Sequence, residues 1–189
     1  MKKLLLLGGS TQQVIAIETA KKLGYYTILC DYLTDNPGQY VSDKFFLEST
    51  TDKEKILQIA ENEKIDGIVA YASDPAAPTA AFVAEKIGLP TNPYRSVDIL
   101  CNKDKFREFL KNNGFNTPLA EGFSNKESAM QSINKFSFPV IIKPVDSSGS
   151  KGATVLKNRD GFEKAVEFAF SFSREASRPI LRIDTRKYG

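Results

Sequence analysis

The sequence predicts an α/β protein in which a parallel sheet covered by helices is followed by a smaller α+β lobe. Short apolar runs alternate with helical patterns through the first half of the chain, as in parallel sheets. Turn-forming Gly, Asp, Ser and Pro residues end these runs. Beyond about residue 114 the alternation changes, and strand patterns flank a small-residue loop. The 189 residues are 41% hydrophobic and 26% charged, which excludes a disordered or low-complexity protein.

The first half of the chain supplies the elements of the parallel sheet. Short, continuous apolar runs are typical of strands covered on both faces. Ser10 or Thr11 is expected to cap the first helix, and Gly24 to end it. The predicted strands are 4–7, 26–30, 45–47 and 68–71, with a turn at 35–38, and the predicted helices are 11–23, 53–63 and 76–87.

The second half begins with a Pro-marked connection at 89–93. A capping box at 124–127 is predicted to open a helix that reaches about residue 136. The other predicted helices are 94–102, 104–113 and 161–172, and the strands are 117–123, 138–144 and 153–156, with the loop at 145–152. We expect a boundary near residues 92–103, and therefore domains at 1–93 and 94–173 with an atypical basic tail at 174–189.

Composition excludes several kinds of chemistry. The chain has no histidine, so Ser/His and Cys/His catalytic pairs and the usual zinc sites are excluded. Cys30 and Cys101 lack CxxC spacing and are expected to be buried thiols in a reducing compartment. The apolar run after Met1 has only four leucines, too few for a signal peptide, and no stretch approaches a membrane span. We therefore expect a soluble, cytoplasmic protein without a membrane partner.

The tail differs from the rest of the chain. It holds four of the seven arginines and the whole formal net charge of +3. A nucleic-acid partner would rest on this tail alone and is not expected.

The most informative segment surrounds Lys143. A lysine at the end of a buried strand directs a fixed charge into a site when an anion meets the ammonium. The Gly/Ser loop after it lets backbone N–H groups approach phosphate oxygens. Lys151 is followed by Gly152, so this is not a Walker A loop. From the pattern alone, a phosphate clamp and an ordinary surface hairpin both remain open.

This segment, FPVIIKPVDSSGSKG, resembles the nucleotide-binding core of the ATP-grasp superfamily, which includes formate-dependent phosphoribosylglycinamide formyltransferase, biotin carboxylase and the carbamoyl phosphate synthase large subunit. The upstream segment NKDKFREFLKNNGFNTP resembles the helix before that core, and LLLLGGS and CDY resemble the Rossmann-like pre-ATP-grasp domain. The resemblance extends from residue 2 to about residue 172. It implies a Rossmann-like domain followed by part of an ATP-grasp lobe.

The resemblance also implies roles for individual residues. Lys105 would contact ATP phosphates from its helix, although Lys103 lies close enough to take that place, and Lys143 would hold the α/β-phosphates. Lys151 is expected to be a solvated charge of the lid. The lid over the triphosphate would be formed by Ser147, Ser148, Gly149, Ser150 and Gly152.

In the first domain the resemblance implies an acceptor-binding turn that contains Gly9 and Ser10. Asp31 and Asp74 follow strands and are expected to line the same crevice, although turn capping explains Asp74 equally well. Asp31 also has near the spacing of a ribose-binding acid, but the G-x-G-x-x-G pattern is absent, so a dinucleotide is not expected.

The superfamily binds its Mg²⁺ ions with Glu and Asn or Asp residues of a second subdomain, and these ligands are expected to be absent from this chain. We hypothesise an ATP-grasp ligase cut short, inactive by itself, with no catalytic residue and no metal ligand of its own. Its partners would be ATP, a small carboxylate or amine and, because an apolar face is left uncovered, a second copy. The alternative is a non-catalytic Rossmann-like module that binds a small anionic ligand or a partner chain.

Overall fold

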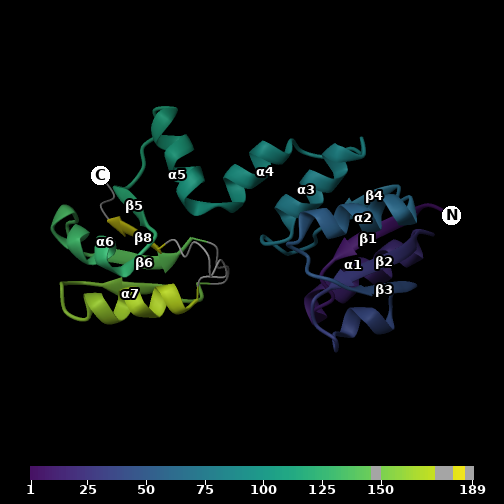
Figure 1. Ribbon diagram of the computed structural model, residues 1–189, viewed down its shortest axis with the longest axis horizontal. Coiled ribbons are helices and arrows are strands. Elements are labelled where there is room, and N and C mark those ends of the chain that lie inside the picture. Colours follow the sequence, from purple (N-terminus) through teal and green to yellow (C-terminus); the bar gives the residue numbers. More distant parts are fainter. Residues whose placement is uncertain (146–149, 173–180, 186–189) are drawn as a thin grey trace. The chain divides into compact units, whose positions relative to one another are not determined.

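The computed structural model describes residues 1–145, 150–172 and 181–185. The chain forms two compact units, Met1–Cys101 and Asn102–Gly189. Each has its own sheet (Figure 1). The α/β class is confirmed.

A parallel four-stranded sheet forms the centre of the first unit. Its strand order is β3-β2-β1-β4, and all three strand pairs are parallel. The strands are β1 (Lys3–Leu7), β2 (Tyr26–Asp31), β3 (Lys44–Leu47) and β4 (Gly67–Val69). The predicted parallel sheet is therefore confirmed, with β4 ending two residues earlier than expected.

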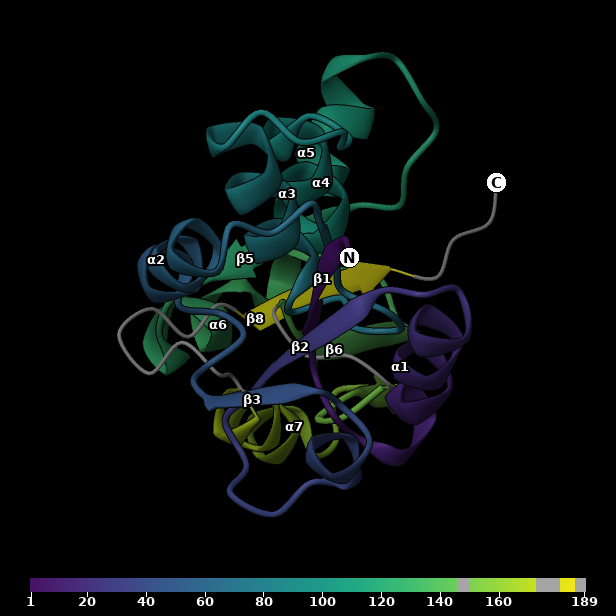
Figure 2. The same ribbon diagram turned by 90° about the vertical axis from the view of Figure 1, so that its right-hand side faces the viewer.

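Helices cover both faces of this sheet (Figure 2). Leu6 of β1 and Leu29 of β2 pack with Ile17 of α1 on one face. Leu5 and Ile28 belong to the core on the other face, which also contains side chains of α2 and α3. Successive strand residues point to opposite faces, which explains why all these strand positions are apolar. The helices are α1 (Thr11–Lys22), α2 (Lys53–Glu63) and α3 (Ala77–Lys86), with the 3-10 helix η1 (Pro37–Tyr40) after β2.

Helix α4 (Tyr94–Cys101) belongs to the first compact unit. The Tyr94 ring meets Phe82 edge to face at a centroid distance of 5.6 Å. Its backbone N–H donates to Glu85 Oε2 (2.8 Å), and Lys53 Nζ donates to its hydroxyl (2.6 Å). The units divide inside the expected interval 92–103, and the assignment of domains to 1–93, 94–173 and 174–189 remains a prediction.

The second unit contains an antiparallel sheet of order β5-β8-β6-β7. Phe162, Val166 and Ala169 of α7 are buried with Val140 and Ile142 of β6. The elements are α5 (Lys103–Asn112), β5 (Ala120–Phe123), α6 (Lys126–Gln131), η2 (Ser132–Lys135), β6 (Val140–Pro144), β7 (Thr154–Leu156), α7 (Phe162–Ser171) and β8 (Leu181–Thr185). Part of the basic tail forms the strand β8, while the other tail residues lie outside the described part.

One predicted helix start is wrong. The N-cap of α6 is Asn125 rather than Ser124. Asn125 Oδ1 accepts a hydrogen bond from Ser128 N at 2.8 Å, so the short amide side chain occupies the place assigned to a Ser124–Glu127 capping box. Among the described residues, no helix has the length and apolarity needed to cross a membrane.

Candidate phosphate-binding site

Lys143 lies near the end of β6, where the sheet fixes its position. Buried and partly exposed residues alternate along this strand. Ile142 and Pro144 are buried, whereas Lys143 shares the opposite, partly exposed face with Ile141. Because Ile142 packs into the core, the backbone that carries Lys143 is held rigidly.

A second lysine reaches the same strand end from α5. Lys103 is the first residue of this helix, and its Nζ donates a hydrogen bond to the carbonyl oxygen of Val145 at 2.9 Å. Val145 is only 3% exposed and follows Lys143 by two residues. The contact therefore brings the side chain of Lys103 to the strand end that carries Lys143 and leads into the Gly/Ser loop.

Lys105, the residue chosen from the sequence, is exposed. Two residues along an α-helix correspond to a rotation of about 200°, so Lys103 and Lys105 point in nearly opposite directions from α5. No observation tests an ATP contact of Lys105, which stays a prediction. The geometry favours Lys103.

Only part of the predicted lid can be placed. Ser147, Ser148 and Gly149 lie outside the described residues. Ser150 is exposed and has φ 59°. Gly152 is buried with φ +72°, and a Cβ there would lie 2.9 Å from Pro144 Cγ and 2.8 Å from Phe172 Cβ. Only glycine fits this position, so the loop returns tightly against the end of β6.

In the first unit, Asp31 closes the turn after β1. Its Oδ2 accepts a hydrogen bond from the Gly9 backbone N–H at 2.7 Å, and its Oδ1 accepts one from Leu33 N at 2.8 Å. The side chain is 5% exposed. Both carboxylate oxygens thus serve the fold, and the backbone N–H of Gly9, a predicted acceptor-binding residue, donates to a side chain of the protein itself.

Ser10 is the N-cap of α1, and a residue missed by the sequence analysis, Gln13, holds it. Gln13 Oε1 accepts hydrogen bonds from Ser10 N and Ser10 Oγ, both at 2.9 Å. Gln13 Nε2 donates to Tyr71 O at 3.0 Å, which ties this turn to the end of β4. The Ser-x-x-Gln spacing of a capping box would have revealed Gln13.

Asp74 is exposed in the turn that precedes α3. Ala76 N and Ala77 N donate to Ser73 O at 3.2 and 3.1 Å. The structure brings Gly9, Ser10 and Asp31 together at the start of α1, and Asp74 lies exposed in the turn before α3. A role in acceptor binding is not tested for any of the four.

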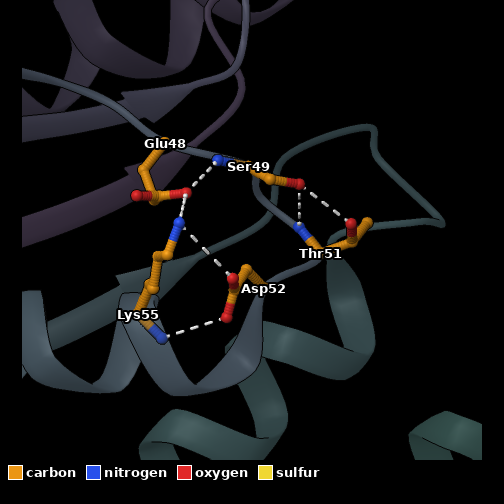
Figure 3. A network of polar contacts seen from close by, with 5 residues as sticks. All are labelled: Glu48, Ser49, Thr51, Asp52 and Lys55. Carbon is orange, nitrogen blue, oxygen red and sulfur yellow. Dashed lines mark hydrogen bonds and ion pairs between the residues drawn. The ribbon is translucent and has the colours of Figure 1, made fainter.

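The loop after β3 carries a polar network (Figure 3). Glu48 Oε1 accepts from Ser49 N at 3.0 Å and from Lys55 Nζ at 3.2 Å. Asp52 caps α2 by accepting from Lys55 N at 3.1 Å, and Ser49 Oγ lies 3.0 Å from Thr51 Oγ1. Most of these polar groups bond one another and so stabilise the start of α2.

The carboxyl end of β2 is an acidic environment. Burial and the nearby carboxylates of Glu48 and Asp31 raise the pKa of the Cys30 thiol to about 12. Within the described residues, no group of three or more His, Cys, Asp or Glu side chains is placed to hold a metal ion.

Comparison with known proteins gives a match to the second unit, which carries Lys103 and Lys143. Residues 102–182 match the family model for the ATP binding domain of the carbamoyl-phosphate synthase L chain. Over 95% of its length the chain is also 30% identical to the formate-dependent phosphoribosylglycinamide formyltransferase of Prochlorococcus marinus, of which it covers 46%. The chain is thus similar to these proteins over nearly its whole length, and its second unit is similar to an ATP binding domain. It spans about half the length of such relatives and corresponds to their N-terminal portion.

Two solved structures show the same fold. The L-amino acid ligase of Bacillus licheniformis matches with a TM-score of 0.72 at 24% identity, over 97% of this chain and 44% of the ligase. The N5-carboxyaminoimidazole synthetase of Staphylococcus aureus, solved with ADP, matches with a TM-score of 0.71 at 18% identity, over 97% of this chain and 47% of the synthetase. Both likenesses therefore extend through the two compact units.

Proposed function

We propose that this chain binds the phosphates of ATP with Lys103, Lys143 and the loop 147–152, as the N-terminal part of an ATP-dependent carboxylate–amine or carbamoyl-phosphate-type ligase. One observation carries the proposal: the hydrogen bond from Lys103 Nζ to Val145 O (2.9 Å) brings Lys103 to the strand end that follows Lys143. Lys103 and Lys143 are far apart in sequence. Their convergence at a Gly-rich loop supports a common anionic ligand.

The residue types suit a polyphosphate. An ammonium group is a compact charge that binds phosphate oxygens without needing a planar partner. Backbone N–H groups of a Gly/Ser loop add donors at close approach. Lys143 would hold the α/β-phosphates. Lys103 would contact the phosphates from α5, in place of Lys105, which the sequence predicts.

No magnesium ligand is assigned among the residues that the structure describes. A bound Mg²⁺ would neutralise charge between the β- and γ-phosphates. The described residues offer no cluster of carboxylates for it. We therefore derive nucleotide binding for this chain and no phosphoryl transfer.

The proposal for an acceptor site at Gly9, Ser10, Asp31 and Asp74 has weaker support. The Gly9 N–H and both Asp31 oxygens are engaged within the fold. The same contacts count against the alternative function, a module that binds a small anion at this turn, because an anion would face the Asp31 carboxylate.

Titration calorimetry with ATP tests the proposal. Lys143→Ala should weaken ATP binding by about 10- to 100-fold, since a charge-assisted hydrogen bond contributes about 1.5–3 kcal/mol. The matched control is Lys164→Ala, which removes an exposed lysine of α7. ATP should bind more tightly than adenosine in the wild type. Unchanged ATP affinity in Lys143→Ala would contradict the proposal.

A further inference from the structure

The second unit contains a groove that the proposed ATP site does not use. It has a volume of about 720 Å³ and lies between α5 and the segment 117–124. This volume lies within the range of about 300–1,000 Å³ that is typical of binding sites. Its α5 wall consists of Asp104, Arg107, Glu108 and Lys111.

These four residues form one face of the helix. Their spacing of three, four and seven residues places them side by side, and their charges alternate in sign along the axis. Asp104 Oδ1 is buried and has no hydrogen-bond partner, which is rare for a carboxylate oxygen.

The order of charges is complementary to itself. If a second α5 lies antiparallel against the first, Asp104 faces Lys111 of the second copy and Arg107 faces Glu108. A two-fold axis repeats each pair, as an interface between identical surfaces requires. In a parallel arrangement like charges would meet, which costs stability.

The opposite face of α5 is only partly covered. Phe106, Phe109 and Leu110 lie together on that face, Phe109 is 44% exposed, and no residue of α5 is buried. A second α5 inserted into the groove turns this apolar face toward Pro118 and Leu119 on the other wall. Both faces of the helix then find partners.

We propose that two copies of this chain associate by inserting each α5 into the groove of the other, with the charged faces antiparallel. The inference is independent of ATP binding. It assigns the expected self-association to α5 and its groove, with Asp104 opposite Lys111 and Arg107 opposite Glu108.

Sedimentation velocity over a concentration series tests the register. The full chain should show a reversible dimer that weakens with added salt. Arg107→Glu and Glu108→Arg should each weaken dimerisation by about tenfold or more, because both contacts between positions 107 and 108 then join like charges. The double variant Arg107→Glu/Glu108→Arg should restore it. Both positions are central in α5, so the exchange leaves the helix ends unchanged.

The matched control is Lys164→Glu on α7, and circular dichroism checks folding of each variant. A monomer at every concentration would overturn the proposal and leave the groove to a different partner, such as an extended peptide beside β5. A dimer that the single variants do not weaken, or that the double variant does not restore, would overturn it as well.

Discussion

The Asp31 carboxylate accepts a hydrogen bond from the Gly9 backbone N–H at 2.7 Å, across 22 residues of sequence. The contact joins the end of β2 to the turn between β1 and α1. It is buried, and it supplies an anion to a helix start that would otherwise attract one. The turn is thereby closed by the chain itself.

Replacing this carboxylate should destabilise the first unit. Asp31→Ala leaves the N–H groups of Gly9 and Leu33 without their partners, at a cost of about 1–3 kcal/mol. Urea unfolding followed by tyrosine fluorescence measures it, because the chain has no tryptophan and six of its seven tyrosines lie in residues 1–101. The control Asp74→Ala removes an exposed carboxylate and should change little. Equal effects of the two variants would argue against a structural role for Asp31.

Gly38 is expected to be intolerant of a side chain. Its N–H donates to Gly9 O at 2.8 Å, and a Cβ would lie 2.7 Å from Gly9 Cα. Because the obstacle is backbone, Gly38→Ala should lower the free energy of unfolding by about 1–3 kcal/mol. At Gly67 a Cβ would meet only the flexible end of Leu4, at 3.0 Å, so Gly67→Ala should cost less. The reverse order would contradict this packing.

Glu63 should contribute to a decrease in the free energy of unfolding of the first unit in acid. The hydrogen bond from Lys44, with the nearby charge of Lys3, lowers the pKa of Glu63 below 4.5. A lowered folded-state pKa stabilises the protein above the unfolded pKa, and this stabilisation is lost as pH falls through the folded value. Glu63→Gln should therefore reduce the free energy of unfolding at neutral pH by up to about 1 kcal/mol, and the difference should shrink in acid. A difference that grows in acid would show the opposite sign of linkage.

The two thiols should react at different rates. Cys30 is 0% exposed, and burial with nearby carboxylates raises its pKa to about 12. Burial, together with Asp74 and Asp98, also raises the pKa of Cys101, which is only partly buried. Disulfide exchange with Ellman's reagent should modify Cys101 first and Cys30 only on unfolding. Retention of the slow phase in Cys30→Ser would contradict this assignment.

The sequence predicted the first unit well because its signals are local. The apolar run of β1 and the stop at Gly24 specify their elements without distant partners. The capping of α6 was misassigned because Ser124 and Asn125 are both good N-caps, and tertiary packing chooses between them. The Ser10-x-x-Gln13 pattern is also a local signal, and it identifies Gln13 as the partner of the N-cap.

The candidate site was harder to predict because it depends on long-range contacts. Lys143 was found from its strand and loop, which are neighbours in sequence. The choice between Lys103 and Lys105 depends on which face of α5 meets Val145, 42 residues after Lys103. Similarly, the positions of Gly9 and Asp31 in the sequence suggested a shared crevice. They did not predict that the Gly9 N–H would donate its hydrogen bond to the Asp31 carboxylate.

The comparison of Lys103→Ala with Lys105→Ala in ATP titrations tests the central claim most directly. The two variants remove the same side chain from the same helix, two residues apart. We predict that Lys103→Ala weakens ATP binding by about tenfold or more, as expected for a lost charge-assisted contact, and that Lys105→Ala binds ATP like the wild type. Normal binding by Lys103→Ala together with weakened binding by Lys105→Ala would contradict the site described at the end of β6.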